Sequence, residues 1–157
     1  MTIPKPTVVN VLATRYASAE MAVIWSAQNK VVLERELWLA VLEAQKDLGI
    51  EIDDDAVAAY RSVIADVDLD SIDRRERVTK HDVKARIEEF SSLAGYQHIH
   101  KGLTSRDLTE NVEQLQIKRS LALTQERLVA VIARLAELAV QYQDTSITGR
   151  SHNVPAQ

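Results

Sequence analysis

The sequence predicts an all-α protein. Apolar residues recur at three- and four-residue steps through most of the chain, as they do on the buried face of an amphipathic helix. Only four glycines and three prolines occur in 157 residues, which is too few for an all-β fold rich in tight turns. The stretch from about residue 104 to 144 contains neither residue type, so it can form one uninterrupted helix.

Composition restricts the class of protein further. Hydrophobic residues make up 46% and charged residues 27% of the chain, as in a globular domain of ordinary size. The net charge is -4 and the basic residues are dispersed, so nucleic acid is not an expected partner. No apolar run approaches the roughly 20 residues of a membrane span, and no secretory signal is recognisable, so a membrane is not expected either. The absence of cysteine excludes disulfides and thiolate chemistry and fits a cytoplasmic protein.

The first part of the chain is expected to pass from an arm into two helices. Residues 1–14 contain Pro4 and Pro6 without a helical period, which indicates an extended or mobile arm. Ser18 is a suitable N-cap for a short helix. A strong helical period runs from about residue 26 to 48, and Gly49 stands where a C-terminal cap belongs.

Three shorter helices and a connector are expected next. The helices cover about residues 53–65, 70–78 and 82–93. The aspartates at 53–55 suit the first turn of a helix and lack the glycine and distal glutamate of a calcium loop, so we predict no metal and no other cofactor. His98 and His100 in the connector match no metal-ligand spacing, and a structural role is expected for both.

A glycine turn at Gly102 leads into the start of the long helix. Thr104 and Ser105 are favourable N-cap residues, and Asp107 follows Thr104 at the spacing of a capping box. A helix N-terminus also has free N–H groups and the positive end of the helix dipole, so with two hydroxyls it can bind a carboxylate or a phosphate. From the residues alone, an ordinary cap and an anion site both remain open.

The length of the last helix has consequences for domain organisation. About 38 residues would span about 57 Å, whereas a compact domain of this size has a radius of gyration of about 15 Å. Such a helix needs partners along its length, and its apolar stripe indicates a helical bundle. We therefore expect an N-terminal helical domain over 15–103, the first long helix of a central bundle over 104–144, and a polar loop over 145–157.

Two histidines occur in contexts that suit a function. His81 lies between Lys80 and Asp82 at an expected helix start, and His152 lies in a polar Gly-Arg-Ser-His segment. A lone histidine at such a place often acts as a cap or a surface hydrogen-bonding group, although functional groups also concentrate on loops. No glycine-rich phosphate loop, HExxH zinc helix or GxSxG elbow is present to decide between these possibilities.

Four separated motifs resemble the adenylosuccinate lyase family of the fumarase/aspartase superfamily. Each is weak alone, but together they run in the same order over nearly all of the chain after residue 14. They are Arg15-Tyr16-Ala17-Ser18-Ala19-Glu20-Met21 with Ile24-Trp25, Lys80-His81-Asp82-Val83, Gly102-Leu103-Thr104-Ser105-Arg106-Asp107, and Gly149-Arg150-Ser151-His152. The first two point to the adenylosuccinate branch, and the last two are shared across the superfamily.

The resemblance implies a carbon–nitrogen lyase of purine biosynthesis. Fumarate would be eliminated from adenylosuccinate to give AMP, and from the succinylocarboxamide purine intermediate to give its carboxamide. Such an elimination needs a base, an acid and donors that stabilise the developing negative charge. Members of the family are homotetramers whose active sites are assembled from three subunits.

Family roles can be carried onto the matching residues. His152 would be the general acid at the leaving nitrogen, and His81 would help to orient the reacting groups. Ser151, which stands in place of the usual threonine before His152, would contribute to substrate binding. The remaining motif residues would contact the substrate: Thr104 and Ser105 its carboxylate, Arg15 and Tyr16 its phosphate, and Lys80, His81 and Asp82 its phosphate and ribose.

The resemblance leaves one part of the site outside the chain. The serine-containing loop that supplies the catalytic base in the family would follow Gln157, so we expect an N-terminal fragment with little or no activity of its own. Two alternatives remain. One is another lyase of the superfamily, such as argininosuccinate lyase or fumarase, and the other is a helical interaction module without catalysis.

Overall fold

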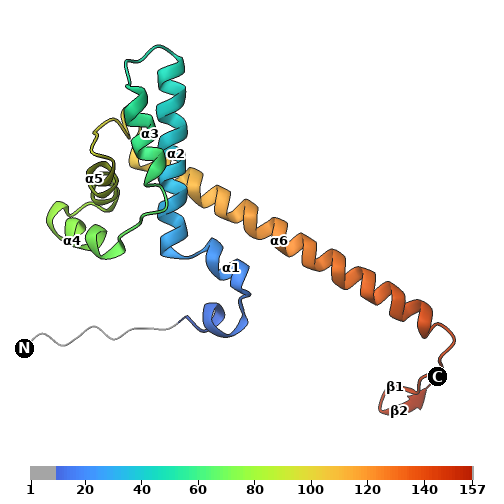
Figure 1. Cartoon of the computed structure of the whole chain (residues 1–157). Coiled ribbons are helices and arrows are strands. Elements are labelled where there is room, and N and C mark those ends of the chain that lie inside the picture. Colours follow the sequence, from blue (N-terminus) through green and yellow to red (C-terminus); the bar gives the residue numbers. More distant parts are fainter. Residues whose placement is uncertain (1–9, 157) are drawn as a thin grey trace, which may run out of the picture. The chain divides into compact units, whose positions relative to one another are not determined.

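The computed structural model describes residues 10–156 and is built from helices, with one short β-hairpin near the end (Figure 1). Helix accounts for 71% of the structure, which confirms the predicted all-α class. The chain forms two compact units, one up to Ser120 and the other from Leu121 onward, and the division falls inside the longest helix.

Residues 10–156 form seven helical elements: six α-helices lie close to where the sequence predicts helices, and η1 was not predicted. They are η1 (Leu12–Tyr16), α1 (Ala19–Ile24), α2 (Ala27–Asp47), α3 (Asp54–Ser62), α4 (Leu69–Thr79), α5 (Asp82–Ala94) and α6 (Ser105–Gln141). The arm expected over residues 1–14 lies mostly outside the described residues. Its last residues, from Leu12, belong to η1, a single turn of π-helix.

Local capping explains several of these boundaries. The hydroxyl of Ser18 accepts a hydrogen bond from the Met21 amide at 3.3 Å, and Ser26 caps α2 in the same way. At the other ends, Gly49 and Gly95 have φ values of 92° and 78°, a left-handed conformation that glycine adopts without steric cost.

The core of the first unit lies between α2 and the helices around it. Trp38 and Leu42 of α2 are buried in one cluster with Phe90 of α5 and Leu108 of α6. Tyr60 of α3 is also fully buried, and its hydroxyl donates to the Tyr96 carbonyl at 2.6 Å. This cluster therefore ties the connector before α6 to α3, and it fixes the ends of α5 and α6 relative to α2.

The first half of α6 is held against α1. The side-chain amide of Gln116, itself buried, donates to the Ile24 carbonyl at 2.7 Å, and the Trp25 indole donates to the Ser120 hydroxyl at 2.9 Å. Both bonds satisfy polar groups at the C-terminal end of α1, where helical carbonyls lack internal partners.

The second unit contains the rest of α6 and the hairpin of β1 (Gly149–Ser151) and β2 (Val154–Ala156). A polar loop was predicted here, so the hairpin is a difference from expectation. His152 and Asn153 form its two-residue turn with φ values of 50° and 64°. Positive φ at both central positions is what the tight hairpin turn requires, and Asn tolerates that conformation well.

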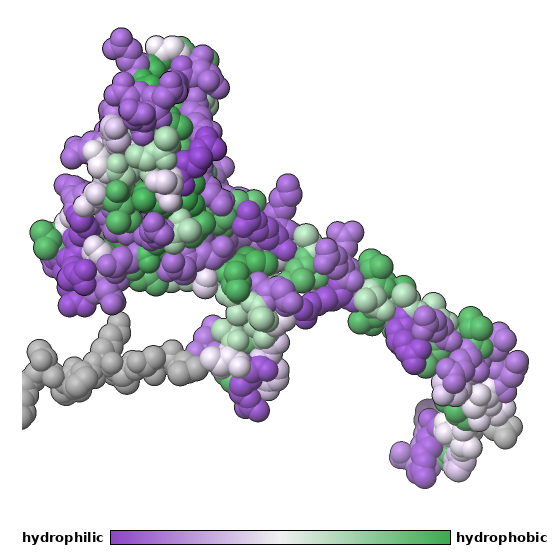
Figure 2. Space-filling model, in the orientation of Figure 1, coloured by the Kyte–Doolittle hydropathy of each residue, from purple (hydrophilic) through white to green (hydrophobic). Residues whose placement is uncertain are grey.

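Apolar side chains remain exposed along the second half of α6 (Figure 2). The exposed residues include Leu121, Leu128, Val131, Ile132 and Leu135. Their three- and four-residue spacing confirms the predicted stripe on this helix. Among the residues that the structure describes, no helix is long and apolar enough to cross a membrane.

Candidate functional site at the starts of α5 and α6

His81 is the N-cap of α5. Its Nδ1 atom accepts a hydrogen bond from the Lys84 amide at 3.2 Å, so the ring satisfies a backbone donor of the first turn. Its own amide and carbonyl both bond to the Thr79 hydroxyl, at 3.3 and 3.1 Å. The side chain is still half exposed, and His81 is thus fixed at the surface with part of its ring open to solvent.

Asp82 follows in the first turn of α5 and is held by an arginine one turn further on. One guanidinium nitrogen of Arg86 donates to Asp82 Oδ2 at 2.9 Å, and the other carboxylate oxygen lies 3.7 Å from His81 Nδ1. Partial burial raises the pKa of Asp82, but hydrogen bonds from the Val83 amide and Arg86 outweigh it and bring the pKa below its usual value. Asp82 is therefore a charged, oriented carboxylate beside His81.

The start of α6 has the predicted cap. The Thr104 amide donates to Asp107 Oδ2 at 2.7 Å, which is the backbone half of a capping box. Hydrogen bonds from the amide and hydroxyl of Thr104 lower the pKa of Asp107, so this carboxylate stays ionised at the helix start. The cap is confirmed. The role of Thr104 and of Ser105, the first helical residue, in binding a substrate carboxylate stays a prediction.

His100 lies in the connector before the start of α6. A structural role was expected, and the ring does accept a hydrogen bond at Nδ1 from the buried Trp38 indole, at 3.0 Å. Burial lowers the pKa of His100, the charge of Asp107 opposes this, and the charge of His81 adds to it. The charges of one residue at each helix start, Asp107 and His81, thus both act on the pKa of His100.

Several residues in or near the motifs have a left-handed backbone conformation. In residues 10–156, the non-glycine residues with positive φ are Lys80, His100, His152 and Asn153. Lys80 and His152 belong to motifs, Asn153 directly follows one, and His100 lies two residues before another. Such conformations cost free energy and concentrate at functional sites.

Arg15 and Tyr16 of the first motif lie on η1, whereas most of its later residues belong to α1. Arg15 and Tyr16 are both exposed, and the Arg15 guanidinium lies 5.7 Å from the centre of the Tyr16 ring. Within the described part of the chain, no hydrogen bond or ion pair joins them to His81 or Thr104. Their expected contact with a phosphate stays a prediction.

Ser151 and His152 belong to the second unit. Both are exposed at the hairpin, His152 in the turn and Ser151 at the end of β1. The turn places the imidazole at the tip of a two-stranded hairpin, and functional side chains often occur at such loops. The assignment of His152 as the general acid stays a prediction.

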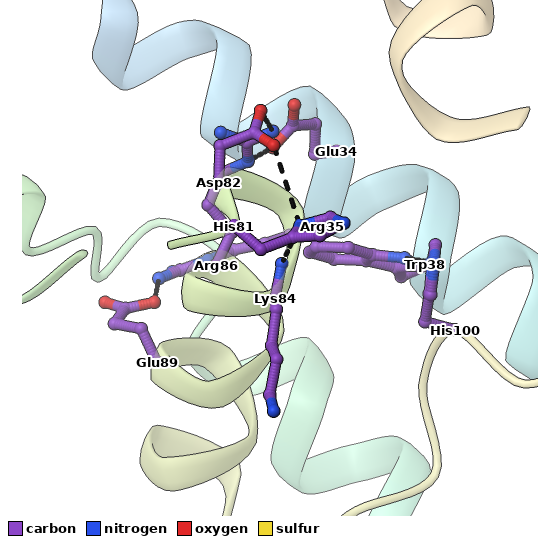
Figure 3. A network of polar contacts seen from close by, with 9 residues as sticks. All are labelled: Glu34, Arg35, Trp38, His81, Asp82, Lys84, Arg86, Glu89 and His100. Carbon is purple, nitrogen blue, oxygen red and sulfur yellow. Dashed lines mark hydrogen bonds and ion pairs between the residues drawn. The ribbon is translucent and has the colours of Figure 1, made fainter. Parts of the chain in front are cut away.

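Two buried ion pairs join α2 to α5 near the His81–Asp82 end of α5 (Figure 3). Arg35 of α2 pairs with Glu89 of α5, and Glu34 of α2 pairs with Arg86 of α5, with Nε and Oε2 2.6 Å apart. Both glutamates and Arg35 are almost completely excluded from solvent. These pairs were not predicted, because a helical period assigns charged residues to the exposed face.

Comparison with known proteins agrees with the motifs and the helical fold. A protein-family model described as lyase matches residues 12–157. The chain is 34% identical to an adenylosuccinate lyase of Saccharomyces cerevisiae, over 93% of this chain and 31% of the relative. It is 32% identical to one from Schistosoma mansoni and 34% identical to one from Streptococcus mutans, again over more than nine-tenths of this chain and about a third of each relative.

The helical fold and the matched region assign the chain to this lyase family. The predicted resemblance to adenylosuccinate lyases is confirmed. The chain spans about a third of the length of the curated relatives it matches.

Proposed function

We propose that this chain is the N-terminal part of an adenylosuccinate lyase. The intact protein would eliminate fumarate from adenylosuccinate to give AMP, and from the succinylocarboxamide purine intermediate to give its carboxamide. The observation that supports the proposal is the similarity of nearly the whole chain to about a third of the length of several adenylosuccinate lyases, together with its match to the lyase family model.

The reaction breaks one C–N bond and one C–H bond and forms the double bond of fumarate. A base removes the proton from the carbon next to a carboxylate, the electron pair forms the double bond, and an acid delivers a proton to the departing nitrogen. Negative charge builds up on the carboxylate during proton removal, so donors aimed at that carboxylate stabilise the transition state.

The chain has residues suited to two of these tasks. The start of α6, with the hydroxyls of Thr104 and Ser105, suits the binding of a carboxylate, because a helix N-terminus offers N–H donors and a positive dipole end. His152, exposed at the hairpin, would donate the proton to the leaving nitrogen. The base is proposed to lie outside this chain.

The remaining motif residues suit the nucleotide part of the substrate. His81 and Asp82 are fixed side by side at the start of α5, where they can bond a ribose hydroxyl or orient a neighbouring group. Lys80 precedes them on exposed, left-handed backbone, and Arg15 presents a guanidinium on η1. Cationic side chains of this kind bind phosphate oxygens.

The whole active site would be shared between subunits. We propose a homotetramer for the intact protein, in which α6 is the first long helix of a central bundle, and a cytoplasmic location. The exposed apolar stripe on α6 supports a bundle, because such a surface is normally covered. It also fits the alternative of a non-catalytic interaction module, and the same site residues fit a sister lyase such as argininosuccinate lyase or fumarase.

Fumarate release separates these possibilities. The assay uses a form of the protein as long as its relatives and supplies adenylosuccinate, argininosuccinate or malate in turn. We expect turnover of adenylosuccinate alone. Release of fumarate from another substrate would establish a sister lyase, and no release from any of the three would favour the interaction module.

A further inference from the structure

The second buried ion pair, Glu34 with Arg86, differs from its neighbour in how well it is satisfied. Arg35 donates to the carbonyls of Val63 and Ile64 at 2.7 and 3.0 Å as well as to Glu89. Glu89 also accepts from the Asp68 amide at 3.2 Å. This pair joins α2 and α5 to the segment between α3 and α4, and its hydrogen bonds account for its burial.

Glu34 has no comparable set of partners. Its side chain is completely buried, yet neither carboxylate oxygen accepts a hydrogen bond from any residue of 10–156. Arg86 Nε forms an ion pair with Glu34 Oε2 at 2.6 Å, but the contact lacks the angles of a well-directed hydrogen bond. Burial raises the pKa of Glu34, although the charges of Arg86 and Lys30 oppose the effect. A buried pair of this kind is weak support for stability, since hydrophobic residues often replace one at no cost.

Arg86 connects this buried carboxylate to the candidate site. Its Nε faces Glu34, and its terminal nitrogen binds Asp82, which lies beside His81 (Figure 3). The arginine side chain is only 12% exposed, so it has little freedom to take up another position. One planar guanidinium thus bridges a carboxylate in the core and a carboxylate at the surface, which a lysine cannot reproduce.

We propose that Glu34 is a positioning residue: by holding Arg86 in place, it fixes Asp82 and the His81 cap in the orientation that the candidate site uses. Glu34 forms an ion pair with Arg86, and within residues 10–156 no hydrogen bond or ion pair joins it directly to His81 or Asp82. Its effect on catalysis rests on the proposed function, whereas its effect on the α5 start does not.

The structural part can be tested on this chain by amide hydrogen exchange. The Lys84 amide donates to His81 Nδ1, so its protection reports on the cap directly. In Glu34→Gln, which keeps the shape and removes the charge, we expect Lys84 exchange to become about fivefold faster, the effect of losing a typical cap. Arg86→Lys should accelerate Lys84 exchange in the same way. Glu89→Gln is the matched control, because it neutralises the other buried glutamate and should leave Lys84 protection unchanged relative to the amides in the middle of α5.

The catalytic part uses a form of the protein as long as its relatives, with adenylosuccinate as the substrate. Glu34→Gln should lower kcat/KM about tenfold or more, as small misplacements do, while Glu89→Gln affects thermal stability without a comparable loss. In an Asp82→Asn background, adding Glu34→Gln should change kcat/KM less than twofold, since the residue acts through Asp82.

The outcomes separate the two proposals. Unchanged Lys84 exchange in a folded Glu34→Gln chain overturns the positioning role. The role is also overturned if Glu34→Gln lowers kcat/KM by the same factor in the wild type and in the Asp82→Asn variant. If the wild type releases no fumarate, the proposed function fails, while faster Lys84 exchange would still establish that Glu34 holds the start of α5.

Discussion

The indole N–H of Trp38 donates to Nδ1 of His100 across 3.0 Å, and the two rings meet edge to face with centroids 5.9 Å apart. Trp38 is a core residue of α2, and His100 lies in the connector before α6. The bond requires Nδ1 to be an acceptor, so the neutral ring carries its proton on Nε2. A residue of the core therefore sets the tautomer of a histidine at the candidate site.

Replacing Trp38 with Phe should release this tautomer. Phe keeps an aromatic ring but cannot donate, so His100 should become a mixture of its two neutral forms at pH 8. Long-range proton–nitrogen NMR spectra of the imidazole measure the tautomer directly. Unfolding should also become easier by about 1–3 kcal/mol, from the lost hydrogen bond and the smaller side chain. A single Nε2-protonated form in the variant would contradict the account.

Acid should weaken the fold through His100. Its pKa in the folded chain is lower than the ordinary 6.5, chiefly because of burial, so the unfolded chain binds the proton more readily. Its contribution to stability is full above pH 6.5 and is lost as the pH falls through the lowered folded value. His100→Gln should flatten this part of the stability curve, measured by urea unfolding at pH 7.5, 6.5 and 5.5. An equally steep curve in the variant would assign the slope to other groups.

Glu34 should have the opposite pH dependence. Burial raises its pKa in the folded chain, so the folded form holds the proton over a range in which the unfolded form has lost it. The contribution of Glu34 to folding stability is full below pH 4.5, its ordinary pKa, and is lost as the pH rises through the raised pKa of the folded chain. The stability of Glu34→Gln relative to wild type should therefore improve from pH 4.5 to 7. The same comparison with Glu36→Gln, an exposed carboxylate of α2, should show no such trend.

The cap of α6 should depend on the charge of Asp107. Asp107→Asn weakens the bond from the Thr104 amide and removes a negative charge from the helix start, so the thermal midpoint at pH 7 should fall. Because the pKa of Asp107 is lowered, its contribution is present above about pH 3.8 and is lost as the pH drops through the folded value. The difference between variant and wild type should accordingly shrink toward pH 2 to 3. A constant difference would show that the side chain acts through shape alone.

The apolar stripe of α6 should make the isolated chain self-associate. Leu128, Ile132 and Leu135 are each more than half exposed and share one face of the helix, an arrangement that favours helix pairing. Ile132→Asp should shift the chain toward a monomer in light scattering. Ile147→Asp is the control, since Ile147 is 79% exposed but lies outside the helix. A monomeric wild type at high concentration would count against the idea.

Most helix boundaries were predictable because their determinants are local. Ser18 and Ser26 begin helices through bonds to amides three residues on, and Gly95 ends α5 through its left-handed φ. Each of these is visible as a residue type at a fixed offset in the sequence. The hairpin was not predicted, because its strands are three residues long and β2 contains Pro155, which is uncommon within a strand.

The candidate site was predictable only in part. His81, Asp82 and Thr104 stand in recognisable motifs, whereas Trp38 and His100 are 62 residues apart and meet only in the folded chain. Glu34 was missed for a related reason. On a helix it looks like any solvent-facing glutamate, and its burial depends on Arg86 of another helix. Pairings of this kind are set by tertiary packing, which periodicity does not reveal.

The isolated chain should not turn over adenylosuccinate. Without the base that we place outside this chain, proton removal from carbon has no catalyst, so fumarate release should stay at the level of a buffer control. Turnover by the chain alone at the rate of an intact lyase would show that the base lies within it.

The central claim is tested most directly by the turnover of adenylosuccinate by a form of the protein as long as its relatives, compared with its His152→Gln variant. Gln keeps a polar side chain at the hairpin turn but cannot donate a proton as an acid. We expect fumarate release by the wild type and a fall in kcat of about 10² to 10⁴ in the variant, the usual worth of a general acid. Equal kcat values in the two proteins would contradict the role of His152.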